Sequence, residues 1–248
     1  MKPRFCSLLL ACLLAVPAFA QWNPGAGQWG KVAPTDLRVM QWNIQDGICR
    51  TANKAEGQLK WCATARIIAA MKPDVLLLQE VGDNSGNGTG SGVDSVNDLT
   101  TVLNLFINGG TDPFLGGTVG SYVKKYDPNF DLPYVVVGTV TDNFNRNVIL
   151  SRYPFADLNG NGNAVFHNFF LSAADWAPGG NAGIRGMIFA EIDLPDSIYR
   201  GDLVACTAHL RSGSAASDIA ERQTASKNIS YFIDAIYNGL GTTTPDPN

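Results

Sequence analysis

Three polar residues, Asn43, Glu80 and His209, each follow a short stretch that is rich in apolar residues. Such stretches are typical of buried strands. In α/β folds, ligands and catalytic groups gather at the ends of strands. An amide, a carboxylate and an imidazole brought to one rim would suit a hard, oxygen-preferring cation and a phosphate ester. We therefore expect metal-assisted chemistry on a phosphate at this rim.

The elements that would carry these residues alternate between strands and helices. Residues 75–78 are apolar on both faces, which suits a strand between a helix layer and another sheet. An apolar period near 3.6 residues predicts a helix before it, which Lys72-Pro73 closes. The pattern predicts strands at 37–43, 74–80, 134–139, 147–151, 185–194 and 202–209, and helices at 54–71, 96–107 and 217–237. This order predicts a mixed α/β domain with helices covering sheets.

Polar loops separate these elements. Residues 82–92 are rich in glycine, serine and asparagine, and 109–132 are rich in turn residues. Residues 157–163 alternate Asp and Asn as a calcium loop does, but Asn168 stands where an EF-hand needs glutamate. We therefore interpret this segment as a turn.

The first twenty residues have the features of a secretory leader. Lys2 and Arg4 precede an apolar run over 8–16, and Ala18-Phe19-Ala20 offers a cleavage site. We expect a signal peptide over 1–20 and a secreted or periplasmic mature protein. An uncleaved anchor is the first alternative, although the run is short for a membrane span. A lipoprotein signal ending before Cys12 is the second.

Charge and cysteine content limit the kinds of binding surface and metal site that the chain can have. The formal net charge is −4, and removal of a leader containing Lys2 and Arg4 makes it about −6. No polybasic tract is present, which disfavours a DNA-coating or membrane-adhering surface. In an oxidising compartment Cys49 and Cys62 are a plausible disulfide pair, and Cys206 is expected to be a buried free thiol. No Cys/His pattern has zinc-ligand spacing.

Four segments, in this order, resemble the endonuclease/exonuclease/phosphatase superfamily, whose members include DNase I-like nucleases and neutral sphingomyelinases. They are residues 39–44 (VMQWNI), 73–81 (PDVLLLQEV), 146–154 (RNVILSRYP) and 202–210 (DLVACTAHL). The resemblance extends over about 37–237. It implies an α/β (α+β) fold of the DNase I-like type, a four-layer αββα sandwich.

The resemblance also implies roles for the three polar residues. Glu80 would bind Mg²⁺, or Mn²⁺ or Ca²⁺, directly, and Asn43 would share the metal shell or reach it through water. His209 would lie beside the scissile phosphate and stabilise charge or donate a proton. The implied substrate is a phosphate ester: nucleic acid, a phospholipid head group or a small phosphodiester. We expect a monomer, and no apolar stretch after the leader is long enough to span a membrane.

The chain departs from the family pattern after residue 237. The family continues with Gly-Asp-x-Asn and Ser-Asp-His, and neither motif occurs here. Prolines flank Asp246 and no apolar strand precedes it, so 245–248 do not replace the first motif. We expect a lead-in at 21–36, a domain at 37–240 that lacks its C-terminal part and has an incomplete second sheet, and a tail at 241–248. This predicts a fragment of a longer protein, with activity near background; the alternative is a truncated gene product with little activity. The alternative function is a noncatalytic binding or scaffolding protein.

Each candidate residue also has a purely structural interpretation. Glu80 could form a surface salt bridge, Asn43 could end its strand through an Asx turn, and His209 could be a hydrogen-bonded histidine. Arg152 and Arg185 could contact phosphate or pair with a carboxylate. Two further residues are expected in structural roles, namely Trp42 in the core and His167 outside the motifs. Loops 82–133 and 157–184 are expected to set substrate selectivity.

Overall fold

The computed structural model describes residues 31, 33, 35–45, 48, 59–82, 95–111, 117–120, 122–140, 145–158, 160, 162–167 and 186–237. The predicted leader, the tail at 241–248, Cys49 and Arg185 lie outside the described residues, as does the side chain of Cys62. The predictions about them, including the disulfide, stay predictions.

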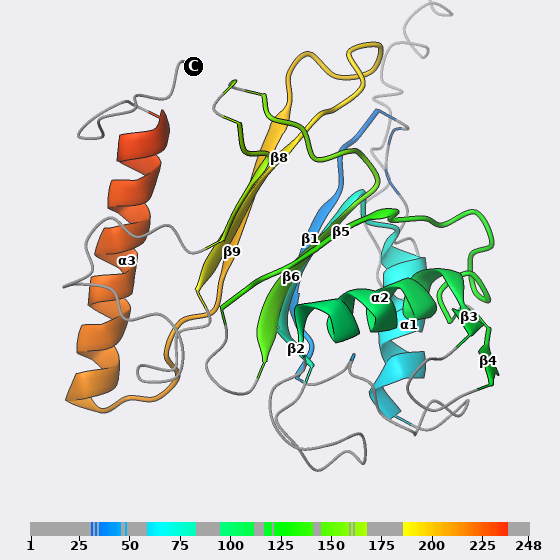
Figure 1. Cartoon of the computed structure of the whole chain (residues 1–248), viewed down its shortest axis with the longest axis horizontal. Coiled ribbons are helices and arrows are strands. Elements are labelled where there is room, and N and C mark those ends of the chain that lie inside the picture. The colour runs from blue at the N-terminus through cyan, green and yellow to red at the C-terminus, as the bar shows by residue number, and fades with distance from the viewer. Residues whose placement is uncertain are drawn as a thin grey trace, which may run out of the picture.

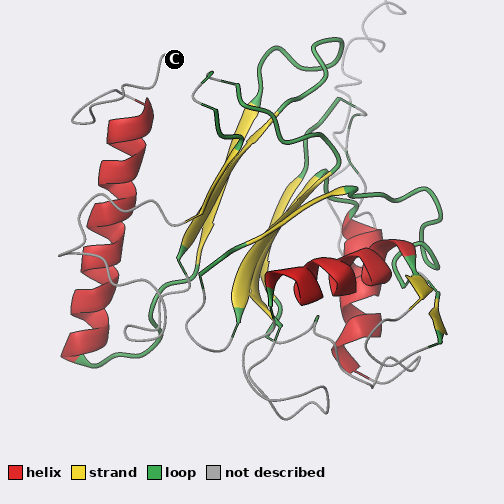
Figure 2. Cartoon of the chain, in the orientation of Figure 1, coloured by secondary structure: helices red, strands yellow, loops and turns green. Residues whose placement is uncertain are grey.

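Two sheets face each other, and helices cover their outer faces (Figures 1 and 2). In the described part of the chain the first sheet has four strands, in the order β1-β2-β6-β5. β1 is parallel to β2, and the other pairs are antiparallel. The bounds are β1 Val39–Asn43, β2 Val75–Val81, β5 Tyr134–Val137 and β6 Arg146–Ser151. Two helices, α1 (Leu59–Met71) and α2 (Val96–Asn108), cover its outer face.

The second sheet has three described strands, in the order β7-β8-β9, all antiparallel. They are β7 (Val165–His167), β8 (Met187–Ile192) and β9 (Leu203–Ala208). The long helix α3 (Ala216–Tyr237) lies along the outer face of this sheet (Figure 1). The expected four-layer αββα arrangement is therefore confirmed. No helix within the described ranges is both long and apolar enough to cross a bilayer.

The apolar residues of β2 divide between two clusters because side chains alternate along a strand. Val75 and Leu77 pack between the sheets, in a cluster with Ile149, Ile188 and Ala190. Leu76 and Leu78 instead join the cluster under α1 and α2. A strand covered on both sides was predicted from its continuous apolar run, and every residue of β2 except Glu80 is buried.

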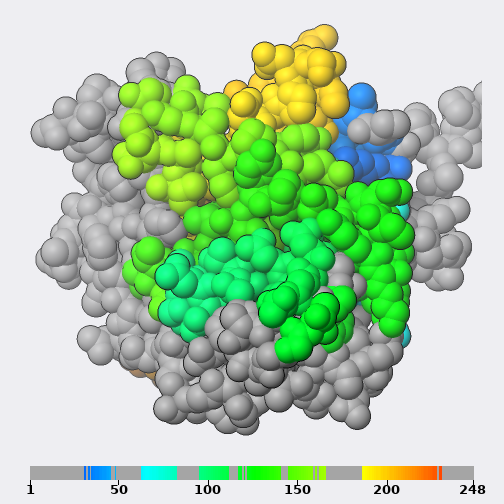
Figure 3. All heavy atoms as spheres, turned by 45° about the vertical axis from the view of Figure 1, so that its right-hand side comes forward, coloured from blue at the N-terminus to red at the C-terminus, as the bar shows by residue number. Residues whose placement is uncertain are grey.

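A serine cap begins α2, and a proline follows the end of α1. Ser95 caps α2, because its hydroxyl accepts a hydrogen bond from the backbone N–H of Asp98 (3.0 Å). α1 ends at Met71, where Lys72 takes a positive φ of 49° and Pro73 prevents continuation. This stop leads the chain directly into Asp74 and β2. Figure 3 shows α2 spread over the outer face of the molecule, with the β8–β9 connection at the top.

Several expectations about element bounds were wrong. β7 lies at 165–167, in a segment predicted to be loop, because it gains its hydrogen bonds from β8 rather than from a local pattern. Another unexpected pair, β3 (Gly110–Thr111) and β4 (Thr118–Val119), lies in the turn-rich region. β5 ends at Val137 rather than Thr139. The guanidinium of Arg146 donates to the carbonyls of Gly138 (3.1 Å) and Thr139 (2.7 Å), where a strand ladder would otherwise continue.

Candidate active site

Asn43, Glu80 and His209 meet at one rim, although they come from three strand ends in two sheets. The imidazole Nε2 of His209 lies 3.5 Å from Nδ2 of Asn43 and 3.6 Å from Oε1 of Glu80. The side chains of His209 and Glu80 are 18% and 22% exposed, so both remain within reach of a ligand. The structure thus brings together all three residues that the sequence singled out.

Gln79 holds the two sheets together beside these residues. Its side-chain amide is buried and donates to the carbonyl of Ala208 (2.9 Å) and to the hydroxyl of Thr207 (3.3 Å). Both acceptors are at the end of β9, directly before His209. Gln79 therefore fixes the position of His209 relative to β2. Gln79 belongs to the family-like segment 73–81, but its contacts across the two sheets depend on tertiary structure.

A β-bulge turns Glu80 toward the rim. Leu78 pairs with Val148 and Val81 with Arg146, so β2 has one more residue than β6 between these two pairs. Glu80 lies in this bulge with a φ of 58°, which is unfavourable for a residue other than glycine. The extra residue shifts the alternation of side chains by one position, so Val81 packs with Leu76 and Leu78 under the helices. Strict alternation would instead have directed Glu80 into that apolar layer.

Asn43 combines the two roles that the sequence left open. Its side-chain oxygen accepts a hydrogen bond from the backbone N–H of Gln45 (3.0 Å), which is the predicted Asx turn. This bond orients the amide so that its nitrogen faces His209. In the His209 tautomer with the proton on Nδ1, Nε2 can accept from that nitrogen. A second lone pair of the Asn43 oxygen remains available to a cation.

The donor set fits a hard cation that keeps part of its water shell. Among the described residues no group of three or more His, Cys, Asp and Glu side chains surrounds a potential metal position. Glu80 offers a carboxylate and Asn43 an amide oxygen at the same rim. Mg²⁺ commonly uses one or two carboxylates in proteins and completes its octahedron with water and substrate phosphate. The described residues at this rim are therefore compatible with Mg²⁺.

The loop after His209 is anchored to the start of α3. The Arg211 guanidinium donates to Asp218 (2.9 Å), and Arg222 donates to the backbone carbonyls of Arg211 (2.9 Å) and Gly213 (2.8 Å). The hydrogen bond from Arg211 lowers the pKa of Asp218. Gly213 has a φ of 104°, and a Cβ there would lie 2.3 Å from the Asp218 carboxylate, so another residue would strain the backbone and displace that carboxylate. These contacts join the loop after His209 to the start of α3.

Other residues considered from the sequence lie elsewhere. Arg152 pairs with Asp74 at the opposite end of β2, so the carboxylate interpretation is confirmed and Arg152 is not part of this rim. His167 is in β7, outside the described side chains. Trp42 packs partly buried against the core under the helices, as expected. Cys206 is free but only half-buried, and burial raises the pKa of its thiol to about 11, which keeps it protonated at neutral pH.

Comparisons with known proteins give two structural neighbours. No protein-family model matches the sequence, and no curated relative matches it. One neighbour is an endonuclease/exonuclease/phosphatase from Beutenbergia cavernae DSM 12333, with 22% identity and a TM-score of 0.42. The alignment covers 81% of this chain and 44% of that one. The other is an endonuclease/exonuclease/phosphatase family protein from Leptotrichia buccalis C-1013-b, with 15% identity and a TM-score of 0.45. That alignment covers 84% of this chain and 65% of the other protein. The chain thus spans less than two thirds of either neighbour, and both bear the name of the family that its four sequence segments resemble.

Proposed function

We propose that this chain carries the Asn-Glu-His part of the active site of a divalent-metal-dependent phosphoric ester hydrolase, of the phosphodiesterase or nuclease type. The observation that supports it best is the convergence of Asn43, Glu80 and His209 from three separate strand ends. The His209 Nε2 lies 3.5 Å from Nδ2 of Asn43 and 3.6 Å from Oε1 of Glu80. A structural salt bridge alone would not require Glu80 to occupy a strained bulge. Strained backbone that surrounding contacts maintain is concentrated at functional sites.

Each residue has a task that follows from its atoms. The Glu80 carboxylate and the Asn43 amide oxygen would hold the cation, which supplies charge neutralisation at the phosphate when bound. His209 would lie beside the phosphate. When its Nε2 carries a proton, as in the other tautomer or in the imidazolium, it can donate a hydrogen bond to an oxygen that gains negative charge, or a proton to the leaving oxygen. Gln79 would keep that imidazole in place through its bonds to the end of β9.

Metal binding and hydrolysis should be measured separately, because each tests a different part of the proposal. We expect Mn²⁺, followed by electron paramagnetic resonance, to bind saturably and to be displaced by Mg²⁺. Plasmid DNA, sphingomyelin vesicles and bis-p-nitrophenyl phosphate, each with and without EDTA, would then identify the substrate class in a chain extended to carry the Gly-Asp-x-Asn and Ser-Asp-His motifs, because activity near background is expected without them. In that extended chain, saturable metal binding without turnover of any of the three would favour the noncatalytic binding function. Absence of both metal binding and turnover would reject the site.

We also propose that the protein is exported. The support is the basic start, the apolar run over 8–16 and the small residues at 18–20. Expression in a bacterial host should give an extracytoplasmic protein whose intact mass corresponds to a chain beginning at Gln21. A protein that stays in the cytoplasm with residues 1–20 attached would contradict export.

A further inference from the structure

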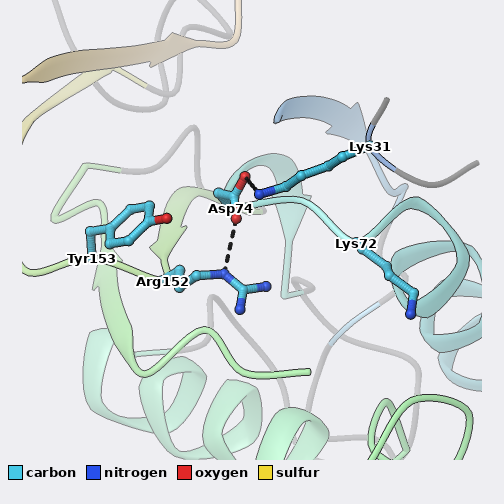
Figure 4. A pocket seen from close by; sticks show the side chains of 5 residues that line it. All are labelled: Lys31, Lys72, Asp74, Arg152 and Tyr153. Carbon is cyan, nitrogen blue, oxygen red and sulfur yellow. Dashed lines mark ion pairs between the residues drawn. The ribbon is translucent and has the colours of Figure 1, made fainter. Parts of the chain in front are cut away.

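A second polar site lies at the opposite end of β2 from Glu80. A pocket of about 390 Å³ is lined by Lys31, Lys72, Asp74, Arg152 and Tyr153 (Figure 4). Asp74 directly precedes β2, and Arg152 directly follows β6, whose last residue pairs with the first residue of β2. At about 3.3 Å per strand residue, Asp74 and Glu80 are about 20 Å apart. The pocket is therefore separate from the candidate active site.

Asp74 holds two of the cationic groups in place. Its side chain is fully buried, and its Oδ2 accepts a hydrogen bond from the backbone N–H of Arg38 (2.9 Å) and pairs with the Lys31 ammonium (2.5 Å). Its Oδ1 lies 2.9 Å from Nε of Arg152, which makes the two groups an ion pair. The two atoms do not form a hydrogen bond with each other. A buried carboxylate needs such partners, which explains the cluster as part of the fold.

The ion pair with Asp74 does not use all the hydrogen-bond donors of Arg152. Arg152 presents only Nε to Asp74, and Figure 4 shows its two terminal nitrogens directed away from the carboxylate. The Arg152 side chain is 36% exposed, so this fork can reach a ligand. A guanidinium fork matches the spacing of two phosphate oxygens.

The pocket also keeps a surplus of positive charge. Lys72 pairs with Asp127 (3.0 Å), and its side chain is half-exposed. Counting Asp127 as well as Asp74, three cationic groups face two carboxylates in a chain whose formal net charge is −4. The hydroxyl of Tyr153, which contacts that of Tyr199 at 3.4 Å, adds a neutral donor on the other wall.

We propose that this pocket binds a small anion with a phosphate group, either inorganic phosphate or a phosphate monoester. The Arg152 fork would contact two phosphate oxygens, and Lys31 and Lys72 would neutralise charge from either side. The small volume of the pocket and its small surplus of charge favour a single phosphate group over a polyanion. This proposal does not depend on the hydrolase function.

Isothermal titration calorimetry of the whole chain tests the pocket directly. Inorganic phosphate and glycerol 3-phosphate should be titrated in separate experiments, in EDTA and at constant ionic strength. We expect saturable binding of one or both at a single site. Lys72→Gln and Arg152→Lys should each weaken it about tenfold, as loss of a charge-assisted hydrogen bond does. Arg152→Lys keeps a cation opposite Asp74 but removes the fork.

Two matched variants separate this pocket from other sources of binding. Lys227→Gln removes an exposed lysine of α3 and should leave the affinity unchanged. Glu80→Gln should also leave it unchanged, because EDTA removes metal and the pocket lies at the other end of β2. Binding that is absent, that depends on Glu80, or that is equal in the wild type and both pocket variants would overturn the proposal. If Arg152→Lys does not fold, Lys72→Gln decides, since that side chain does not contact Asp74.

Discussion

Glu80→Gln is expected to remove saturable Mn²⁺ binding and, with it, metal-dependent hydrolysis. The substitution keeps the size of the side chain and takes away the carboxylate charge at the rim. Changes to groups that merely support metal ligands cost about 10–100-fold in affinity, so loss of a direct ligand should cost at least about 100-fold. The measurement is metal affinity by electron paramagnetic resonance, together with turnover, by the extended chain, of whichever substrate the panel identifies.

His209→Ala should give a different pattern. Mn²⁺ should still bind, because the imidazole is assigned to the phosphate and not to the cation. Turnover by the extended chain should fall by about 10²–10⁴-fold, the usual contribution of a positioned proton donor or charge-stabilising group. Equal loss of metal affinity in both variants would mean that His209 is a ligand. Retained turnover in both would show that the rim is not the active site.

The positive φ of Glu80 predicts an unusual effect of glycine on stability at this position. Glu80→Gly should be at least as stable as the wild type, because a φ of 58° suits glycine and strains glutamate. Gln41→Gly, at an exposed position of β1 outside the positive-φ residues, is the matched control and should lose about 0.5–1 kcal/mol. If both glycine variants lose the same stability in urea, the bulge at Glu80 stores no strain.

The second large effect is expected at Gln79. Gln79→Met keeps the length of the side chain but leaves the Ala208 carbonyl and the Thr207 hydroxyl without their donor. A buried polar group that loses its partner costs about 1–3 kcal/mol, so urea unfolding should occur at a clearly lower concentration. Turnover should fall as well, because His209 follows directly after these acceptors.

Kinetics can distinguish positioning by Gln79 from general destabilisation. At a temperature where the variant is fully folded, Gln79→Met should lower kcat while Mn²⁺ affinity stays near the wild-type value. Thr207→Val removes only the longer of the two hydrogen bonds, at 3.3 Å, and should have a smaller effect on both stability and kcat. A Gln79→Met variant that is less stable but has an unchanged kcat would assign the residue to the fold alone.

The sequence by itself determined the elements that depend on local pattern. β2 was predictable because its run of valine and leucine is long enough to fill both faces of a central strand. The end of α1 was predictable because proline cannot continue a helix. The three candidate residues were recognisable for a related reason: each is a polar side chain that follows an apolar stretch, where a strand ends and its residues no longer need to fill the core.

Tertiary structure decided which of these residues meet and what each can do. The bulge at Glu80 arises from unequal residue counts in β2 and β6, two strands that are far apart in the chain. Arg152 belongs to the family-like motif, yet it lies at the other end of β2, because β6 runs antiparallel and leads the chain away from the rim. Gln79 could not be assigned from its neighbours, since its partners are in the second sheet.

The physical reason for this division is the range of the forces involved. Hydrophobic periodicity and backbone stereochemistry act over a few residues, and so they can be inferred from the sequence directly. Strand register and contacts between sheets join residues far apart in the chain, and many pairings satisfy the same local pattern. The sequence therefore indicated Asn43, Glu80 and His209 as candidates, but only the packing of the two sheets brings them to one rim. The buried amide of Gln79 stabilises this packing because it donates to an acceptor at the end of β9.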